Sequence, residues 1–422
     1  MISQKIKNWL NDEKKKNKLN IKVIKLSDLK KWNLNKINIS HNSGKFFKIV
    51  GLRVQTNFYK NNWDQPIIVQ NEVGILGIIK NKFNKKYLLQ AKVEPGNKNK
   101  LQLSPTVQAT KSNYKQVHGG KSVPYLKYFL NTDKKNIMNQ SEQGFRYLNK
   151  FNSNILINIQ DKIKLLPSFF WFNKTELAAL IKKRNILNMD TISVFSSFIK
   201  KSKIDIPNNS TKKINSLIDI CDKKFFIRRK IVPIKSLKDW KISKNKISHK
   251  NEKHFSIIGV NVKTNKREVK EWNQPLIKGK KLAMAGFFLK KIDNTNHYLC
   301  RYILKPGLNK SAITCTVNTS DIKNYKKNKI LTFFQKKLIK NFLNKKNKDE
   351  LIYDNIISDE GGRFFHCEIR NIAILLKENI NLKLPETYFW LSQNQMINMI
   401  KDKRIDIEAR LLFACINIKN LI

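Results

Sequence analysis

Apolar and polar residues alternate along short segments of this 422-residue chain, and turn-forming residues separate one segment from the next. A period of two, with many β-branched and aromatic residues, predicts strands. We expect strands at 46–56, 67–79, 86–93 and 101–109, and a second series at 255–264, 276–289, 297–304 and 311–317. Helices are expected at 26–32, 122–130 and 174–182, with counterparts at 234–240, 329–343 and 392–401. Each half of the chain is therefore predicted to be α+β.

The second series repeats the first in its residues as well as in its elements. The segment Leu26–Thr56 is answered by Ile234–Thr264, and both contain a tryptophan, the triplet Ile-Ser-His and a strand ending in Val-x-Thr. The later matched pieces are WDQP and WNQP, EPGN and KPGL, QSEQGFR and SDEGGRF, and LPSFFW and LPETYFW. Six of the seven tryptophans form pairs separated by 208, 209 and 219 residues, which indicates a tandem duplication.

The repeat divides the chain into two domains of ordinary size. We expect a first domain at residues 21–200 and a second at residues 231–422. A basic N-terminal segment, 1–20, precedes them, and a linker rich in Lys, Asn and Ser, 201–230, joins them.

The composition narrows the functional classes. The net charge is +53, but lysine is spread along the whole chain together with Asn and Ile, which is typical of an AT-rich genome and argues against a selected nucleic-acid site. The longest apolar run has about eight residues, too short to span a membrane, and the N-terminus lacks the apolar core of a secretory signal. The five cysteines are scattered, with no close pair of the kind that binds zinc. We expect a cytoplasmic protein without a metal site.

One predicted strand carries an unusual polar face. Between residues 101 and 110, uncharged polar residues alternate with apolar ones, which places them on one side of the strand. They are Gln102, Ser104, Thr106, Gln108 and Thr110. In a chain this rich in lysine, a solvent-facing strand would carry charges, so we interpret this face as binding a neutral, hydroxyl-rich ligand.

The run QAKVEPGNKNKLQLSPTVQATKSNYKQVHGGKSVPYL, with QSEQG and Arg146 in the first half and EGGRFFHCEIRN in the second, resembles the NDP-hexose 2,3-dehydratase family over residues 20–418. The resemblance implies two Nudix-like mixed α/β domains related by duplication, sugar-nucleotide sites in both halves and a homodimer. It also implies a dTDP-4-keto-6-deoxyglucose substrate, no cofactor, and a downstream 3-ketoreductase that consumes an unstable product. The Glu-rich helix that a Nudix hydrolase requires is missing from the sequence, which excludes that activity.

The implied reaction needs a base at C3, an acid at the C2 oxygen and donors to the enolate oxygen on C4. The candidate catalytic residues are His118, Tyr114 and Glu142 in the first half, and His366 and Glu368 in the second. Arg146 and Arg363 are candidate diphosphate partners, because guanidinium binds phosphate with two hydrogen bonds. The remaining candidate substrate-binding residues are Trp63, Gln65, Ser104, Thr106, Gln108, Thr110, Ser112, Asn113, Gln143, Gly144, Trp272, Gln274, Glu360, Gly361, Gly362 and Asn371.

The sequence leaves two questions open. Trp63 and Trp272 each lie in a polar turn, where the ring either covers a ligand or anchors the core. The second repeat lacks the SNY-x-x-VH segment and its polar strand is eroded, yet its EGGRFFHCE segment carries a histidine that the first repeat lacks. The active site is therefore in one repeat or is composite. The alternative function is a decayed protein that binds a sugar nucleotide without catalysis.

Overall fold

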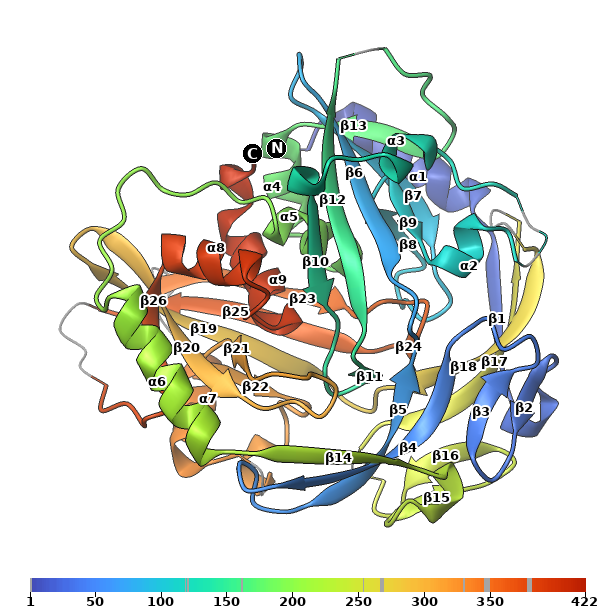
Figure 1. Cartoon of the computed structure of the whole chain (residues 1–422). Coiled ribbons are helices and arrows are strands. Elements are labelled where there is room, and N and C mark those ends of the chain that lie inside the picture. Colours follow the sequence, from blue (N-terminus) through green and yellow to red (C-terminus); the bar gives the residue numbers. More distant parts are fainter. Residues whose placement is uncertain are drawn as a thin grey trace.

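The structure is a computed structural model that describes residues 2–117, 119, 121–160, 162–252, 254–265, 269–328, 331–344, 350–377 and 382–422. Its described strands form four mixed sheets, and each half of the chain supplies most of one six-stranded and one seven-stranded sheet (Figure 1). The predicted duplication and the mixed α/β character are confirmed.

The first half builds its sheets as follows. The six-stranded sheet contains β2 (Trp32–Leu34), β3 (Asn38–His41), β4 (Lys48–Thr56), β5 (Trp63–Val69), β11 (Tyr147–Leu148) and the later strand β14 (Ile227–Val232). The seven-stranded sheet contains β6 (Gly74–Asn81), β7 (Tyr87–Val93), β8 (Leu101–Ser104), β9 (Val107–Ala109), β10 (Ile137–Ser141), β12 (Phe151–Ile159) and β13 (Phe169–Phe172).

The second half repeats this arrangement. Its six-stranded sheet contains the early strand β1 (Leu19–Ile24), β15 (Trp240–Ile242), β16 (Lys246–His249), β17 (Ser256–Thr264), β18 (Glu271–Lys278) and β24 (Phe364–Phe365). Its seven-stranded sheet contains β19 (Ala283–Ile292), β20 (Thr295–Ile303), β21 (Ala312–Thr314), β22 (Val317–Thr319), β23 (Leu351–Ser358), β25 (Glu368–Leu375) and β26 (Tyr388–Ser392).

Apart from α2, the helices lie at equivalent points of the two halves. They are α1 (Gln4–Lys16), α2 (Lys111–Tyr114), α3 (Lys127–Leu130), α4 (Lys174–Leu180), α5 (Met189–Ser196), α6 (Thr211–Lys224), α7 (Phe333–Leu343), α8 (Gln393–Lys401) and α9 (Ile407–Asn417). Helices α4, α7 and α8 begin with capping boxes, in which the N-cap side chain and the Glu or Gln at the third position each satisfy a backbone N–H.

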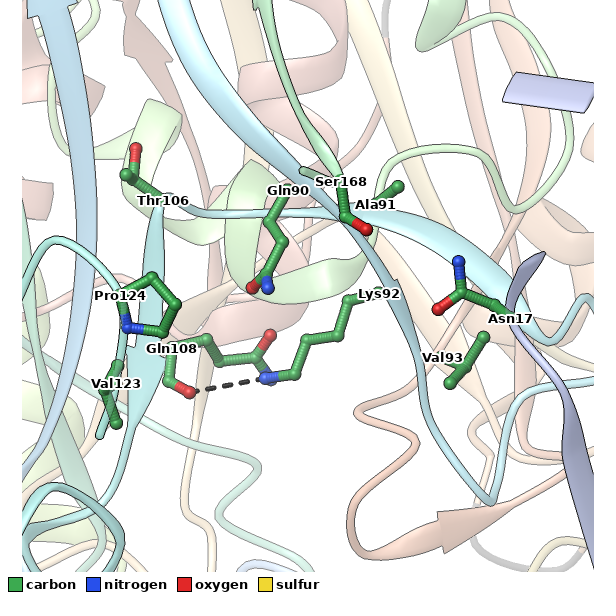
Figure 2. A pocket seen from close by; sticks show the side chains of 10 residues that line it. All are labelled: Asn17, Gln90, Ala91, Lys92, Val93, Thr106, Gln108, Val123, Pro124 and Ser168. Atoms are coloured by element: carbon green, nitrogen blue, oxygen red, sulfur yellow. Dashed lines mark hydrogen bonds between the residues drawn. The ribbon is translucent and has the colours of Figure 1, made fainter. Parts of the chain in front are cut away.

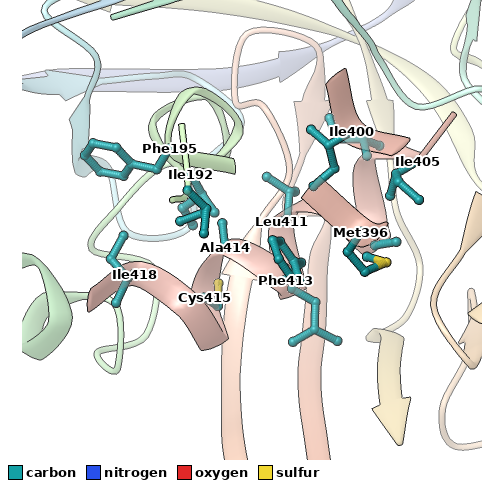
Figure 3. Packing of buried hydrophobic residues seen from close by; sticks show 14 of the residues in the cluster. Ile192, Phe195, Met396, Ile400, Ile405, Leu411, Phe413, Ala414, Cys415 and Ile418 are labelled. Atoms are coloured by element: carbon teal, nitrogen blue, oxygen red, sulfur yellow. The ribbon is translucent and has the colours of Figure 1, made fainter. Parts of the chain in front are cut away.

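The two halves exchange a strand with each other. Strand β1 pairs with β17 of the second half, and β14 pairs with β4 of the first half (Figure 1). Helices α5 and α9 also pack together across the halves, and Ile192, Phe195, Leu411 and Phe413 lie in one continuous core (Figure 3). The halves therefore share both sheets and core.

Several predicted elements differ from the observed ones. Residues 26–28 and 234–236 form short 3-10 turns followed by strands, because the tryptophans at 32 and 240 begin β2 and β15. Of the helix expected at 122–130, only α3 forms. The expected linker 201–230 contains α6 and part of β14, and the expected N-terminal segment 1–20 contains α1.

Candidate functional site

A small pocket lies between β7 and β9 of the first repeat (Figure 2). Its polar walls are Gln90 and Lys92 of β7, Gln108 of β9, and Thr106, Asn17 and Ser168; Val123 and Pro124 close one side. The cavity volume is about 40 Å³. This is well below the roughly 300 Å³ of a typical ligand site, so it accommodates only part of a sugar nucleotide.

Two partners hold the side chain of Gln108, and a third holds its backbone carbonyl. Its Nε2 donates to Glu94 Oε1 at 3.0 Å, and Asn188 Nδ2 donates to its Oε1 at 3.0 Å. Lys92 Nζ donates to the backbone carbonyl of Gln108 at 3.3 Å (Figure 2). The same Nζ lies 3.9 Å from Glu94 Oε1. The pocket wall is thus preorganised, with one ammonium among uncharged polar groups.

The same place in the second repeat is chemically different. Gln90 and Arg301 are equivalent, because they occupy the same position relative to the paired tryptophans of the strands beside them. The same alignment makes Lys92 equivalent to Ile303 and Glu94 equivalent to Lys305. The Lys305 side chain is fully buried and forms ion pairs with Asp406 at 2.8 Å and Glu408 at 2.5 Å. The second repeat fills this position with an internal ion cluster.

Residues 101–110 do not form one continuous strand. Pro105 separates β8 from β9, and Thr106 instead joins β6 to β7 by accepting from the Ile79 N–H at 3.0 Å and donating to the Leu88 carbonyl. Thr316 makes the same pair of bonds in the second repeat. Gln102 and Ser104 are buried and bonded to protein groups, and Thr106 and Gln108 are the members of the predicted face that line the pocket.

Helix α2 follows this strand and carries the next group of predicted residues. Ser112 donates to Glu72 Oε2 at 2.9 Å and also contacts the Thr110 hydroxyl at 3.0 Å, while Asn113 is half-buried. Burial, and then the charge of Glu72, raise the pKa of Tyr114, so its phenol keeps its proton. His118 lies outside the described residues.

The Pro-Gly turns of each repeat dock onto the other repeat. The Gly96 N–H donates to the Gly361 carbonyl at 2.8 Å, and the His366 N–H donates to the Gly96 carbonyl at 2.7 Å. In the mirrored contact, the Gly307 N–H donates to the Gly144 carbonyl at 2.6 Å, and the Asn149 N–H donates to the Gly307 carbonyl at 2.8 Å. Gly144 and Gly361 thus serve the junction between the repeats.

Trp63 and Trp272 each orient a glutamine side chain. Trp63 Nε1 donates to Gln65 Oε1 at 2.8 Å, and Gln65 Nε2 donates to the Phe145 carbonyl at 2.8 Å. Trp272 and Gln274 repeat this arrangement at 2.7 Å each, with the carbonyl of Gly362 as acceptor. These four side chains hold the loops that precede Arg146 and Arg363.

The two arginines reach across the junction instead of toward the pocket. The Arg146 guanidinium lies 4.2 Å from the centre of the Phe255 ring, and that of Arg363 lies 4.2 Å from the Phe47 ring. Each also donates to the carbonyl of the residue before it. Their planar faces are used in cation–π contacts between the repeats.

Buried carboxyl groups gather at the same junction. Glu142 accepts from Asn152 Nδ2 at 2.7 Å, and burial, followed by the charge of Glu360, raises its pKa to about 7. Glu360 accepts from the Tyr147 hydroxyl at 2.7 Å. Gln143 Nε2 donates to Asp359 at 3.4 Å, and burial raises the pKa of Asp359 to about 6. None of these residues is among the described residues that line the pocket.

The remaining second-repeat candidates have identifiable partners. His366 has φ +54°, like Asn149 at the equivalent position, and its ring stacks on Phe365 at 4.0 Å. Glu368 accepts from Lys98 at 2.7 Å, Arg184 at 3.0 Å and Asn185 at 2.7 Å, and its pKa is lowered because these bonds outweigh its burial. Asn371 Nδ2 donates to the Ile369 carbonyl at 3.0 Å. These contacts hold the three residues in place within the fold.

Comparison with known proteins now decides the family. A family model described as NDP-hexose 2,3-dehydratase matches residues 3–198 and, a second time, residues 211–416. The chain belongs to the NDP-hexose 2,3-dehydratase family. It is 30% identical over 443 residues to a dTDP-4-dehydro-6-deoxy-alpha-D-glucopyranose 2,3-dehydratase of Saccharopolyspora spinosa, covering 97% of this chain and 90% of the relative. Proteins of the same name from Amycolatopsis orientalis (31%; 99% and 90% covered) and Streptomyces violaceoruber (30%; 93% and 91% covered) are also similar.

Several residues that line the pocket of this NDP-hexose 2,3-dehydratase family member were not predicted from the sequence. Lys92 and Gln90 lie in a strand that was read only for its apolar residues, although they occupy alternate positions where the second repeat has Ile303 and Arg301. Asn17 and Ser168 are far from the motif in sequence, and no local pattern marks them. Among the described residues, no group of three or more His, Cys, Asp or Glu could hold a metal ion, and no helix is long and apolar enough to cross a membrane.

Proposed function

We propose that this chain removes water across C2 and C3 of dTDP-4-dehydro-6-deoxyglucose, and that the reacting end of the sugar binds in the pocket between β7 and β9. The substrate follows from the names of the three relatives, which match nearly the whole chain. The observation that carries the location is the preorganised pocket wall of Gln90, Lys92 and Gln108, which the second repeat does not reproduce.

The chemistry assigns a task to each group. The C3 hydrogen is α to the C4 carbonyl, so its removal leaves negative charge on the C4 oxygen, and the Lys92 ammonium is the cation of the pocket that can stabilise it. The uncharged amides of Gln90 and Gln108 suit sugar hydroxyls. We assign proton abstraction at C3 to His118. As the C2–O bond breaks, the departing oxygen takes a proton from Tyr114 and leaves as water, and the protonated His118 then returns a proton to Tyr114, whose raised pKa keeps its phenol protonated between turnovers.

The wider organisation extends this proposal. We propose that the repeats begin at α1 and α6, in agreement with the two family matches, and that both are Nudix-like domains. A homodimer, a cytoplasmic location and a 3-ketoreductase that consumes the unstable product remain predictions of the resemblance and the sequence.

The test is turnover with a coupled 3-ketoreductase in deuterated water. Wild-type protein should consume dTDP-4-dehydro-6-deoxyglucose with loss of the 2-hydroxyl, and substrate recovered before completion should carry deuterium at C3. Binding without loss of the hydroxyl would leave a non-catalytic sugar-nucleotide binding protein.

Two variants then locate the reaction. His118→Ala and Lys92→Ile should each lower kcat by about a hundredfold or more with dTDP affinity retained, because each removes a group that acts mainly in the transition state. Lys92→Ile copies the residue of the second repeat. Near-normal turnover of both variants would indicate that the reaction takes place at the repeat junction, where His366 and Glu368 lie.

A further inference from the structure

A second, larger hollow opens beside the proposed pocket. It lies where the end of α1 and the start of β1 meet the facing ends of β17 and β18, and its volume is about 750 Å³. We call it the lysine groove, after Lys14, Lys18, Lys100, Lys263 and Lys270, which line it. We propose that the lysine groove binds the diphosphate of the nucleotide while the sugar reaches the pocket; this rests on the proposed function for the identity of the sugar.

The two hollows are neighbours. Asn17 lines both the pocket and the lysine groove, and it is the residue at which α1 ends before β1 begins. A volume of about 750 Å³ lies in the range of roughly 300–1,000 Å³ that small-molecule sites occupy, unlike that of the pocket alone. Together the two hollows have room for a sugar nucleotide, with a place for each end.

The charge of the lysine groove matches a diphosphate. Among the described residues that line it, five are lysines and one, Glu271, is acidic; Glu271 is already paired with Lys263 at 3.3 Å. The arginines that the sequence indicated for this task, Arg146 and Arg363, are committed to aromatic rings at the repeat junction. The exposed lysines of the groove therefore offer cations beside the pocket for a bound diphosphate.

The other repeat supplies an internal comparison. The Lys18 N–H donates to Asn265 Oδ1 at 3.0 Å and the Phe226 N–H donates to Asn57 Oδ1 at 2.7 Å, so Lys18 and Phe226 are equivalent. Strand register also makes Lys263 equivalent to Gln55.

Further equivalences follow from this alignment. Lys14 corresponds to Asp222, whereas Lys100 corresponds to Lys310, so this cation is present in both copies. The one cation that the other copy adds, Arg228 in place of Asn20, lies over the Phe226 ring. A lysine-rich composition acts on both repeats alike. The cations are nevertheless concentrated at the copy that adjoins the polar pocket, and this favours selection for a ligand over compositional drift.

The test compares ligands and variants of the whole chain by calorimetry. Lys18→Gln/Lys270→Gln removes two exposed lysines for which only backbone hydrogen bonds are described. Lys212→Gln/Lys213→Gln, on the exposed face of α6, removes the same charge from the other repeat. We expect the first variant to bind dTDP about tenfold more weakly and with a shallower salt dependence, and the second to match wild type within about twofold. Thymidine, which lacks phosphate, should bind all three proteins alike.

The contrary results are distinct. Equal losses of dTDP affinity in both variants would show that the overall positive charge of the +53 chain, and not the lysine groove, attracts the ligand. Unchanged dTDP affinity in the first variant would place the diphosphate elsewhere. Either result overturns the proposal. Tighter binding of single-stranded DNA than of dTDP, lost in the first variant, would make the groove a nucleic-acid site. In the coupled assay the first variant should raise KM and keep kcat. Wild-type protein without turnover would contradict the proposed function while leaving the dTDP measurement interpretable.

Discussion

Glu142 carries its carboxyl in the interior, where the two repeats meet. Its neighbours include Glu360 and Arg410 of the second repeat, and one of its oxygens, Oε2, has no hydrogen-bond partner among the described residues. The pKa of about 7 exceeds the ordinary 4.5, so the folded protein binds this proton more tightly than the unfolded chain. This contribution to stability is complete below pH 4.5 and is lost as the pH rises through 7.

The substitution Glu142→Gln removes this titration. At pH 8 the variant should be more stable than wild type by about 1–3 kcal/mol, and at pH 5 the difference should be small, because wild-type Glu142 is then largely protonated. Urea unfolding at both pH values measures it. The control Glu252→Gln, at an exposed and ion-paired carboxyl, should leave stability nearly unchanged, because surface ion pairs contribute little. Equal stability of Glu142→Gln and wild type at pH 8 would mean that Glu142 is ionised without cost.

Residue types alone could not show which polar groups of this chain line the pocket. His366 was a candidate because histidine is rare in this chain, but its backbone is left-handed, as is that of Asn149 at the equivalent position of the other repeat. Lys92 was not predicted as a site residue, because lysine is the commonest residue of this chain and only the fold shows that Lys92 faces a pocket.

At the scale of elements, the Pro-Gly turns after β7 and β20 join the repeats. A side chain on Gly96 would overlap the Phe364 carbonyl, and one on Gly307 would overlap the Tyr147 carbonyl. Gly96→Ala and Gly307→Ala should each lower the free energy of unfolding by about 3 kcal/mol, since the backbones must separate. Gly44→Ala is the control: Gly44 has φ +66° but open space around it, so the cost should be near 1 kcal/mol. Thermal denaturation ranks the three, and similar losses would contradict the docking role.

Periodicity predicted some strand positions, such as 46–56, 86–93 and 255–264, but not the strand partners. The single strands expected at 67–79 and 276–289 are each interrupted and form two strands, and β10, β12, β23 and β25 were not expected. The alternation that predicts β4 at 46–56 says nothing of β14, which pairs with it from 170 residues or more away. The expected linker was read from its Lys, Asn and Ser content, but the apolar residues of α6, such as Ile214 and Ile218, are buried in the core. Tertiary packing here outweighs local composition.

For the whole molecule, the exchanged strands and the shared core predict cooperative unfolding. Neither six-stranded sheet is complete without a strand from the other half, and α5 packs on α9 with Arg410 donating to Ser193 Oγ at 2.7 Å and to the Ser141 carbonyl at 2.6 Å. Chains of this length usually unfold domain by domain. Here an opening of either half exposes the core of both.

Calorimetry should therefore show one transition with equal calorimetric and van't Hoff enthalpies. Ile78→Ala in β6 and Leu289→Ala in β19 remove fully or almost fully buried side chains from the first and second halves, and each should lower the same single Tm. The cost of each cavity, about 2–5 kcal/mol, is spread over a large cooperative unit, so the shift should be a few degrees at most. Two transitions, with each variant moving a different one, would show that the halves unfold independently despite the exchanged strands.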